Sequence, residues 1–205
     1  MTALPARQIG LFGGSTPAVD ATALARAPRL WLDRTAWVEY VPSWLSGDET
    51  LLDDLIPNTR WHEQQREIYD RTVTVPRLVA SLPADGKIPA VLEHARAQLN
   101  ARYETKFVNI GLGYYRHGAD SVAWHGDYVA RELRQAVVAT ISLGEPRRFL
   151  LRPKGGGASI AYSLGWGDLL VMGGSCQRTW QHAVPKVAHA GPRIAVMFRP
   201  VWYQP

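Results

Sequence analysis

From Lys106 onward, the chain consists of short apolar segments that are separated by glycine-rich turns. Strands this short and this regularly spaced favour an antiparallel sandwich or jelly roll, because a parallel sheet would need a helix between successive strands. The run Gly155–Gly157 lies between two segments and is typical of a hairpin turn, not of a phosphate-binding loop. The expected strands cover residues 106–115, 135–143, 147–152, 158–163, 167–172 and 193–199.

The first hundred residues follow a different pattern, in which two helical segments flank a stretch that contains proline. Residues 46–56 start with Ser and Asp, which favour a helix N-cap, and residues 88–103 carry apolar residues at helical spacing. Between them, residues 71–87 include Pro76 and Pro83, which favours a strand-and-loop flap over a strand of the core. The sequence therefore predicts a mainly β protein with N-terminal α-helices.

Length and composition narrow the class of protein further. The 205 residues suffice for one compact domain with a sizeable core, and two full domains would be unusual at this length. A single cysteine, Cys176, excludes an intramolecular disulfide and leaves no thiol cluster for zinc. No run of about 18 apolar residues is present, and the first residues are too rich in glycine for a signal peptide. We therefore expect a soluble, cytoplasmic monomer that does not bind a membrane.

The formal net charge of +5 is unevenly distributed along the chain. Residues 1–127 hold 13 basic and 15 acidic side chains, whereas residues 128–205 hold 10 basic and 3 acidic ones. A basic C-terminal part favours an anionic partner such as nucleic acid. The candidates for phosphate contacts are Arg131, Arg134, Arg147, Arg148, Arg152 and Lys154.

The segment WHGD carries two side chains that suit a metal ion. His125 and Asp127 are two residues apart, so on an extended strand they point to the same side. One carboxylate and two histidines form the ligand set of non-haem Fe(II) oxygenases, which leaves open positions for a co-substrate and O₂. The second histidine is His182 or His189. We favour His182, because it follows an apolar strand and a Gly-Gly turn, whereas His189 lies in a turn-like stretch that faces solvent.

The last expected strand, RIAVMFR, has an arginine at each end. Arg193 and Arg199 are six residues apart, so at strand periodicity they share one face, and Ile194, Val196 and Phe198 line the other. Arginine binds carboxylates through two parallel hydrogen bonds and stays charged. Two arginines on one face therefore suit both ends of a short dicarboxylate. Taken alone, this strand would better suit an ordinary solvated face with two surface arginines.

In combination, these motifs resemble the AlkB family of Fe(II)/2-oxoglutarate-dependent dioxygenases. The segment YRHGADSVAWHGD resembles the family's tyrosine, turn and metal-ligand block. The segment GDLLVMGGSCQRTWQHAVPK is similar to its most recognisable stretch, and GPRIAVMFRP to its closing arginine strand. The resemblance extends from about Gly111 to Arg199, and it implies a double-stranded β-helix (jelly-roll) dioxygenase core over residues 106–205.

The resemblance also implies a set of bound groups. Fe(II) would be the metal, and 2-oxoglutarate and O₂ would be the co-substrates. Arg199 would pair with the C1 carboxylate of 2-oxoglutarate, and Arg193, helped by the hydroxyl of Tyr115, with the C5 carboxylate. The implied metal ligands are His125, Asp127 and His182.

Residues 1–105 would then form a helical cover and a nucleotide-recognition lid within the same domain. In this part VPRL, which includes Arg77, resembles the Pro-Arg element of the family's lid, and Trp61 lies where several members carry an aromatic residue. The resemblance implies that an extruded base stacks against His125. It also makes Trp61 and Arg77 candidates for contacts with the substrate, with a ring packed under a loop as the alternative for Trp61.

The implied reaction is oxidative demethylation of 1-methyladenine and 3-methylcytosine in DNA, on single strands above all, with RNA as a further substrate. It consumes O₂ and 2-oxoglutarate and releases formaldehyde, succinate and CO₂. A base inside a duplex must be flipped out before such an enzyme can reach it. Two alternatives stay open: a 2-oxoglutarate-dependent hydroxylase of a protein or small molecule, and a jelly-roll module that binds an anion without catalysis.

Three positions depart from the family pattern. Gly113 and Ala195 stand where many members carry asparagines that bind 2-oxoglutarate. Val129 stands where repair members carry an acidic residue that contacts the base. Two hydrogen bonds to the co-substrate are therefore either missing or supplied by other residues, and the base preference stays open.

Overall fold

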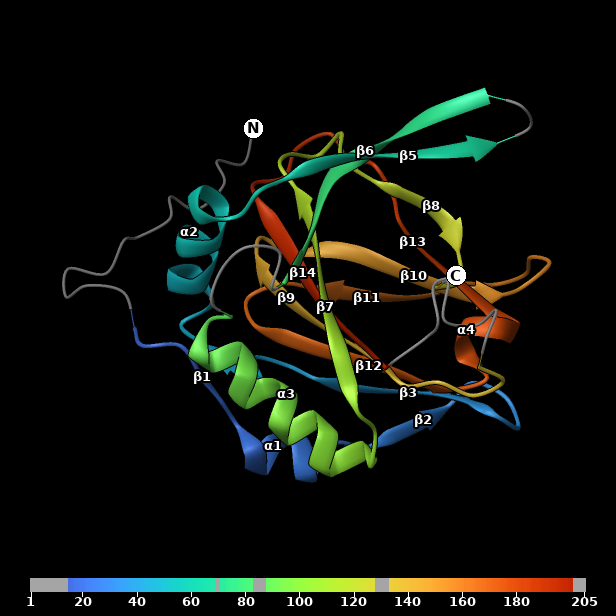
Figure 1. Ribbon diagram of the computed structural model, residues 1–205. Helices are drawn as coiled ribbons and strands as arrows, with labels where there is room; N and C mark the ends of the chain where they lie inside the picture. Colours follow the sequence, from blue (N-terminus) through green and yellow to red (C-terminus); the bar gives the residue numbers. More distant parts are fainter. Residues whose placement is uncertain (1–14, 69–70, 83–87, 128–132, 201–205) are drawn as a thin grey trace, which may run out of the picture.

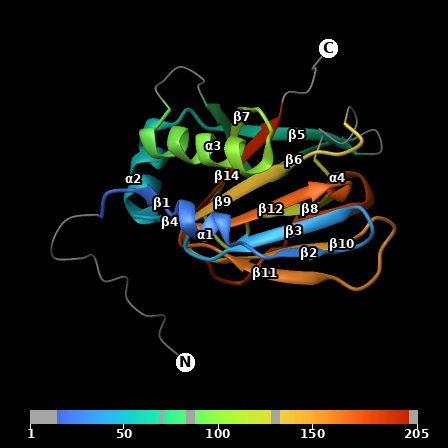
Figure 2. The ribbon, with the colours of Figure 1, turned by 90° about the horizontal axis from the view of Figure 1, so that it is seen from below.

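The computed structural model describes residues 15–68, 71–82, 88–127 and 133–200. In these residues two antiparallel sheets lie face to face, as Figures 1 and 2 show together. The larger sheet has eight strands in the order β2-β3-β12-β9-β14-β7-β6-β5, and the smaller has four in the order β11-β10-β13-β8. This arrangement confirms the predicted mainly β, jelly-roll class.

The strands of the larger sheet are β2 (Arg29–Trp31), β3 (Ala36–Val41), β5 (His62–Ile68), β6 (Arg71–Leu82), β7 (Phe107–Tyr115), β9 (Val138–Gly144), β12 (Asp168–Gly174) and β14 (Arg193–Pro200). Those of the smaller sheet are β8 (Val122–His125), β10 (Arg147–Pro153), β11 (Ile160–Leu164) and β13 (Trp180–Val184). The short strands β1 (Ala18–Val19) and β4 (Leu45–Ser46) pair with each other. Every strand expected after Lys106 is present, but the expected set does not include β8 and β13.

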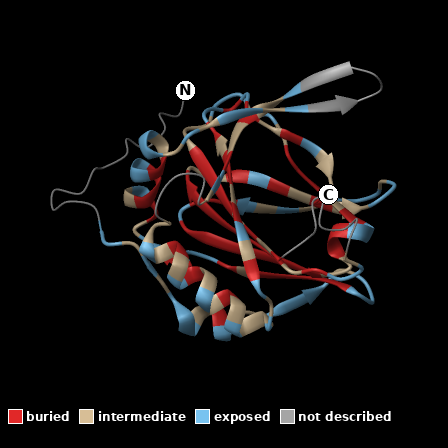
Figure 3. Ribbon diagram, in the orientation of Figure 1, coloured by how far each residue is buried: buried red, intermediate tan, exposed pale blue. Residues whose placement is uncertain are grey.

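The side chains of β14 pack alternately into two separate hydrophobic clusters. Ile194, Val196 and Phe198 belong to the cluster on the helical side of the larger sheet, and each is fully buried. Ala195 and Met197 belong to the cluster between the two sheets. Because β14 lies between β9 and β7, this alternation is fixed in the buried centre of the sheet (Figure 3). The predicted two faces of this strand are therefore confirmed.

Two helices cover the outer face of the larger sheet (Figure 2). The fully buried Leu92 and Leu99 belong to the cluster on this side, as expected from the helical stripe. None of the helices among the described residues is long and apolar enough to cross a membrane. The covering helices are α2 (Asp48–Asn58) and α3 (Ala90–Tyr103), and the shorter ones are α1 (Ala21–Ala25) and α4 (Cys176–Thr179).

The start of α2 differs from the prediction. Its N-cap is Gly47, which has a φ of +67° and supplies no side-chain hydrogen bond. A Cβ atom at this position would lie 2.5 Å from the carbonyl oxygen of Ser15. The expected Ser or Asp cap is therefore wrong, because the close approach of the preceding chain requires glycine there.

The first hundred residues contribute more strand than the sequence predicts. β3 pairs with β12 and β6 pairs with β7, so both belong to the same sheet as the C-terminal strands. Glu39 interrupts the apolar pattern of β3, yet it is 1% exposed. Its carboxylate pairs with Arg29 at 2.8 Å and accepts a hydrogen bond from Tyr103 at 2.6 Å. Partners supplied by distant segments therefore make this a core strand, and residues 1–105 are more than a helical cover.

A bulge explains how proline fits inside β6. The register with β5 shifts between Glu63 and Gln64, which leaves Pro76 and Arg77 in the bulge. The carbonyl oxygen of Pro76 accepts a hydrogen bond from the Ser121 amide at 2.7 Å. Since a bulge does not require the N–H that proline lacks, the expected strand-and-loop flap is here a strand. The bulge also turns Arg77 toward the inside of the molecule.

Arg147 is buried, although the sequence places it among the candidates for phosphate contacts. It is 2% exposed. Its terminal nitrogens donate hydrogen bonds of 2.7 to 3.4 Å to the carbonyl oxygens of His117, Gly118, Asp120 and Pro185. The phosphate prediction is wrong for this residue, because its donors already join two loops.

We expect Arg147→Lys to lower the free energy of unfolding by about 2–4 kcal/mol, because a single ammonium leaves several buried carbonyls without a donor. Urea denaturation measures this change. Arg148→Lys is the control, since Arg148 is exposed and its replacement should cost less than about 0.5 kcal/mol. Equal losses in the two variants would show that the buried contacts of Arg147 contribute nothing special.

Candidate active site

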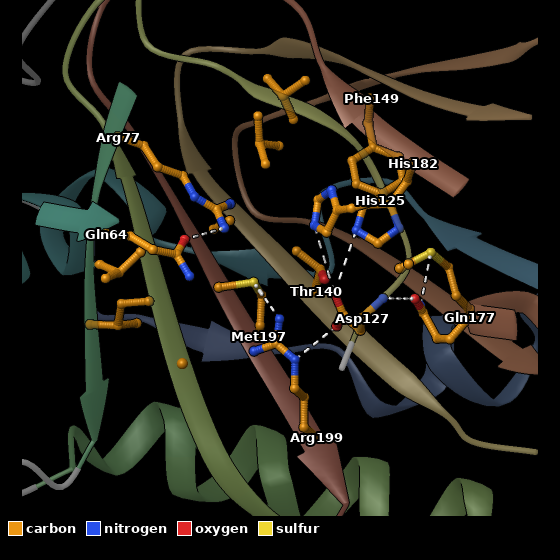
Figure 4. A pocket seen from close by; sticks show the side chains of 18 of the residues that line it. Gln64, Arg77, His125, Asp127, Thr140, Phe149, Gln177, His182, Met197 and Arg199 are labelled. Atoms are coloured by element: carbon orange, nitrogen blue, oxygen red, sulfur yellow. Dashed lines mark hydrogen bonds and ion pairs between the residues drawn. The ribbon is translucent and has the colours of Figure 1, made fainter. Parts of the chain in front are cut away.

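A cavity of about 1200 Å³ opens between the two sheets. Its walls come from strands of both sheets and from α4. Pockets for small ligands typically measure roughly 300–1,000 Å³, so this one has room for a small co-substrate and part of a second molecule. Figure 4 shows the polar side chains that point into it.

His125 and His182 face each other from neighbouring strands on one side of this cavity. They are direct partners in the register of β8 and β13, and their ring centroids are 4.2 Å apart. The Oδ1 atom of Asp127 lies 3.9 Å from Nε2 of His125 and 3.6 Å from Nε2 of His182. One ligand atom from each residue lies within 4.8 Å of the others, a spacing that suits one metal ion. The structure thus brings together the three residues that the sequence singles out.

A backbone contact sets the tautomer of His125. Its Nδ1 atom lies 2.8 Å from the carbonyl oxygen of Ala123. Because a carbonyl oxygen only accepts, Nδ1 carries the proton and Nε2 offers its lone pair on the side of Asp127. Contacts of this kind orient histidines that bind metals.

Asp127 is held in place from two sides. Its amide donates a hydrogen bond to Oε1 of Gln177 at 2.8 Å, and its Oδ2 atom accepts one from Nε of Arg199 at 2.8 Å. Burial acts to raise the pKa of Asp127, but the charges of Arg199, His182 and His125 and the Arg199 hydrogen bond hold this pKa far below its usual value. The carboxylate is therefore ionised at neutral pH, as a metal ligand must be.

His182 lies deeper in the fold than His125. It is 7% exposed, and its ring stacks on Phe149 with centroids 5.2 Å apart. Burial, together with the neighbouring His125, lowers the pKa of His182 to about 3. The ring is thus neutral at physiological pH, which is the form that binds metals.

Arg193 lies at the other end of the cavity face of β14. It is 1% exposed, and its Nη2 atom donates to Oγ of Ser142 at 2.7 Å. Its Nε and Nη1 atoms are buried and have no hydrogen-bond partner among the described residues. Burial lowers the pKa of Arg193 to about 10, so the side chain stays charged at neutral pH. A buried cation with free donors fits an anionic group, as one carboxylate of 2-oxoglutarate would be.

Tyr115 and Arg77 complete this end of the cavity. Tyr115 is the register partner of Arg193 and is 1% exposed. Its hydroxyl accepts a hydrogen bond from Nη1 of Arg77 at 3.0 Å. Arg77, expected at the substrate, therefore reaches down beside the expected 2-oxoglutarate residues.

Trp61 does not reach the cavity. Its indole N–H donates to the carbonyl oxygen of Ile56 at 3.0 Å, and its ring packs on Tyr114 with centroids 5.1 Å apart. Tyr114 and Tyr115 are consecutive in β7 and point to opposite faces of the sheet. The side chain of the next residue, His62, lines the cavity instead. The expected substrate contact of Trp61 is replaced by a packing role on the helical side.

Of the remaining candidates, His189 is exposed on the loop before β14 and does not belong to the metal-type cluster. Val129 and Arg131 lie outside the described residues. Lys154 lines the cavity, and the guanidinium of Arg152 lies 4.0 Å from the centroid of a Trp124 ring. The exposed candidates elsewhere are Arg134 and Arg148.

Two contributors to the site escape the sequence prediction. Gln177 orients Asp127 from the four-residue helix α4, for which the sequence has no recognisable signal. Ser142 orients Arg193 from β9. Thr140 and Ser142 are polar residues two apart in an otherwise apolar strand, and this spacing is the signal that identifies the cavity face of β9.

Gly126 separates two of the candidate ligands and lies against the backbone of α4. A Cβ atom there would lie 2.3 Å from the carbonyl oxygen of Gln177. We expect Gly126→Ala to displace His125 relative to Asp127 and to weaken Mn(II) binding about 10- to 100-fold, as calorimetric titration measures. Ser159→Ala is the control, because Ser159 is exposed and does not line the cavity. Unchanged affinity in Gly126→Ala would contradict the assignment.

Comparison with known proteins gives the family. The model of the 2OG-Fe(II) oxygenase superfamily matches residues 29–199. An "Alpha-ketoglutarate-dependent dioxygenase alkB homolog 3" of Bos taurus is 29% identical over 186 residues, which cover 78% of this chain and 64% of the relative. A "DNA oxidative demethylase ALKBH2" of Arabidopsis thaliana is 27% identical over 191 residues, with coverage of 73% and 61%. The chain thus spans less than two thirds of the length of these curated relatives.

Solved structures show the same fold. An oxidoreductase of the 2OG-Fe(II) oxygenase family from Burkholderia pseudomallei has a TM-score of 0.56 at 13% identity, over 79% of this chain and 84% of that one. A prolyl hydroxylase from Trichoplax adhaerens has a TM-score of 0.56 at 11% identity, over 74% and 75%. Because the family model spans the whole cavity and most of the chain, the protein belongs to the 2OG-Fe(II) oxygenase superfamily, and its resemblance to the AlkB members is confirmed.

Proposed function

We propose that the protein is an Fe(II)- and 2-oxoglutarate-dependent dioxygenase that removes alkyl groups from bases of nucleic acid. The supporting observation is a single cavity that holds both a His-Asp-His cluster and a buried arginine with free donors. The cluster suits Fe(II) with open coordination positions, and the arginine suits an anionic co-substrate. The substrate class is supported by the names of similar proteins, which include a DNA oxidative demethylase.

In this proposal His125, Asp127 and His182 bind the metal. The His182 ring is neutral and the Asp127 carboxylate is ionised at neutral pH, so both are in the form that binds a metal. Gln177 keeps the Asp127 backbone in place, and the Ala123 carbonyl keeps His125 in the ligating tautomer. Fe(II) with its co-substrates supplies the oxidising power that attacks a C–H bond.

Residues of β14 and its neighbour β7 would hold the co-substrate. Arg199, which pairs with Asp127, would bind the C1 carboxylate of 2-oxoglutarate. Arg193 and its register partner Tyr115 would bind the C5 carboxylate. Room near Arg199 comes from Gly111, because a Cβ atom there would lie 2.9 Å from Nη1 of Arg199.

An alkylated base enters the remaining space and lies against the ring of His125, whose side chain is 14% exposed. Hydroxylation of an N-methyl group gives a hemiaminal, which loses formaldehyde and restores the base. Single-stranded DNA is the favoured substrate, with RNA as a further one, because unpaired bases enter without the cost of flipping. Arg152 and Lys154 contact the phosphates, and the protein acts as a monomer.

The direct test uses oligonucleotides that contain 1-methyladenine or 3-methylcytosine, as single- and double-stranded DNA and as RNA. With Fe(II), O₂ and 2-oxoglutarate, mass spectrometry should show the loss of one methyl group. His125→Ala should abolish the reaction, and His189→Ala, which changes an exposed histidine outside the cluster, should retain it.

Unchanged oligonucleotides together with steady succinate release would overturn the nucleic-acid substrate and favour a hydroxylase of another molecule. Absence of succinate under all conditions would instead favour a binding module without catalysis.

A second test addresses the phosphate contacts. We expect Lys154→Gln to weaken the binding of a single-stranded oligonucleotide and to reduce the slope of log K against log salt by about 0.7, because one counterion fewer is released. Fluorescence anisotropy at several salt concentrations measures both. Lys186→Gln removes an exposed lysine that does not line the cavity and should leave the slope unchanged. Equal slopes in the wild type and both variants would show that Lys154 does not contact the phosphates.

A further inference from the structure

Arg77 enters the cavity from an unexpected direction. It belongs to the bulge of β6, and the hydrogen bond between Ser121 and the Pro76 carbonyl holds this bulge against the loop before β8. Arg77 is 8% exposed, although the sequence suggests a residue of a lid. In Figure 4 its guanidinium points into the cavity from the side opposite Gln177. The backbone of the bulge therefore directs the Arg77 side chain into the cavity.

The contacts of Arg77 leave its charge without a counterion. Nη1 donates to the Tyr115 hydroxyl at 3.0 Å, and Nη2 donates to Oε1 of Gln64 at 3.4 Å. Nε is buried and has no hydrogen-bond partner within the described part of the chain. No ion pair joins Arg77 to a carboxylate of the described residues. Both of its partners are neutral groups.

Gly113 provides the space that the guanidinium uses. A Cβ atom on Gly113 would lie 3.5 Å from Nη1 of Arg77 and 3.8 Å from the Tyr115 ring. Alanine would therefore fit at this position, but the amide of an asparagine would reach into the volume of the guanidinium. Arg77 thus stands beside the place where many related proteins have an asparagine for the co-substrate.

Positive charge gathers around Tyr115. The guanidinium carbons of Arg77, Arg147 and Arg193 lie 5.8, 5.7 and 5.1 Å from the centroid of its ring. Each of the three has a buried Nε without a partner among the described residues, but only Arg77 and Arg193 line the cavity, whereas the terminal nitrogens of Arg147 donate to backbone carbonyls. Two neighbouring buried cations repel each other unless an anion lies between them. The geometry therefore has a place for one carboxylate beside Tyr115.

We propose that Arg77 is a co-substrate-binding residue, which together with Arg193 and Tyr115 binds the carboxylate of 2-oxoglutarate that lies away from the metal. This inference rests on the proposed function for the identity of the co-substrate. The far carboxylate is the one concerned, because Arg199 already occupies the metal end beside Asp127. Arg77 thereby supplies a contact that Gly113 cannot make.

The test is calorimetric titration of the Mn(II)-loaded protein with 2-oxoglutarate, which measures binding without turnover. We expect Arg77→Ala to weaken the affinity about 10- to 100-fold, as loss of a charged hydrogen bond does, and Arg77→Lys to weaken it less. Mn(II) affinity and the melting temperature report whether each variant is folded. Arg26→Ala, which changes an exposed arginine outside the cavity, is the control and should bind as the wild type does.

A second ligand identifies the carboxylate. 2-Oxopentanoate keeps the keto acid end of 2-oxoglutarate but lacks the far carboxylate, so wild type and Arg77→Ala should bind it equally. Wild-type affinity of Arg77→Ala for 2-oxoglutarate would overturn the proposal. Equal losses for both ligands would also overturn it, since they would indicate a general structural role.

A second substitution, at Gly113, distinguishes binding of the co-substrate by Arg77 from a purely structural role of Arg77. Gly113→Asn should weaken 2-oxoglutarate binding in the wild type, because the amide competes with the Arg77 guanidinium for space. In Arg77→Ala the same substitution should strengthen binding, because the space is free and the amide supplies a donor. Identical effects in both backgrounds would overturn the proposal. These titrations contain no nucleic acid, so failure of the demethylation assay and failure of this inference are separate results.

Discussion

The pairing of β14 between β7 and β9 is the constraint on which the cavity depends. Its side chains alternate between the apolar cluster beneath the helices and the cavity that contains Arg193 and Arg199. A slip of one residue would place both guanidinium groups among apolar side chains and expose Ile194, Val196 and Phe198. Hydrophobic burial and the cost of burying unpaired charge therefore select the same register. The cavity floor is as fixed as the core on its other side.

Charge balance is the second constraint. Asp127 is the only carboxylate among the described residues that line the cavity. The cations that line it are Arg77, Lys154, Arg178, Arg193 and Arg199. A divalent metal adds further positive charge to this surplus, and a dicarboxylate offsets it at both ends. Metal and co-substrate thus stabilise each other's binding through charge, in addition to any direct bond between them.

Part of the site could be predicted because it depends on period-two spacing. Arg193 and Arg199 share a face of β14, as their spacing in the sequence indicates. His125 ends β8 and Asp127 follows just beyond the strand, yet their spacing of two residues still identifies the pair that the cluster brings together. The same spacing indicates that Arg147 is buried, because it lies on the same face of β10 as the buried Phe149 and Leu151. For Trp61 the prediction chose the wrong one of two neighbouring residues, since His62, the next residue, lines the cavity.

The rest could not be predicted, because it depends on contacts between distant segments. Glu39 makes β3 look unlike a core strand until its partners Arg29 and Tyr103 are known. Pro76 argues against a strand unless the bulge is known. Gln177 acts through a hydrogen bond across 50 residues of sequence. Even a strong local sequence pattern contains no information about pairings between distant segments.

The bulge of β6 is the point at which two parts of the site meet. Residues 78–82 of β6 pair with β7, whereas the part before the bulge pairs only with β5. Arg77 lies at this junction and contacts Tyr115 from there. Through its hydrogen bond to Gln64, Arg77 also contacts β5, the strand that carries Gln64 and His62 along the cavity wall. One hairpin thus supplies Arg77, Gln64 and His62 to the cavity wall, and the bulge is what lets Arg77 reach Tyr115 from it.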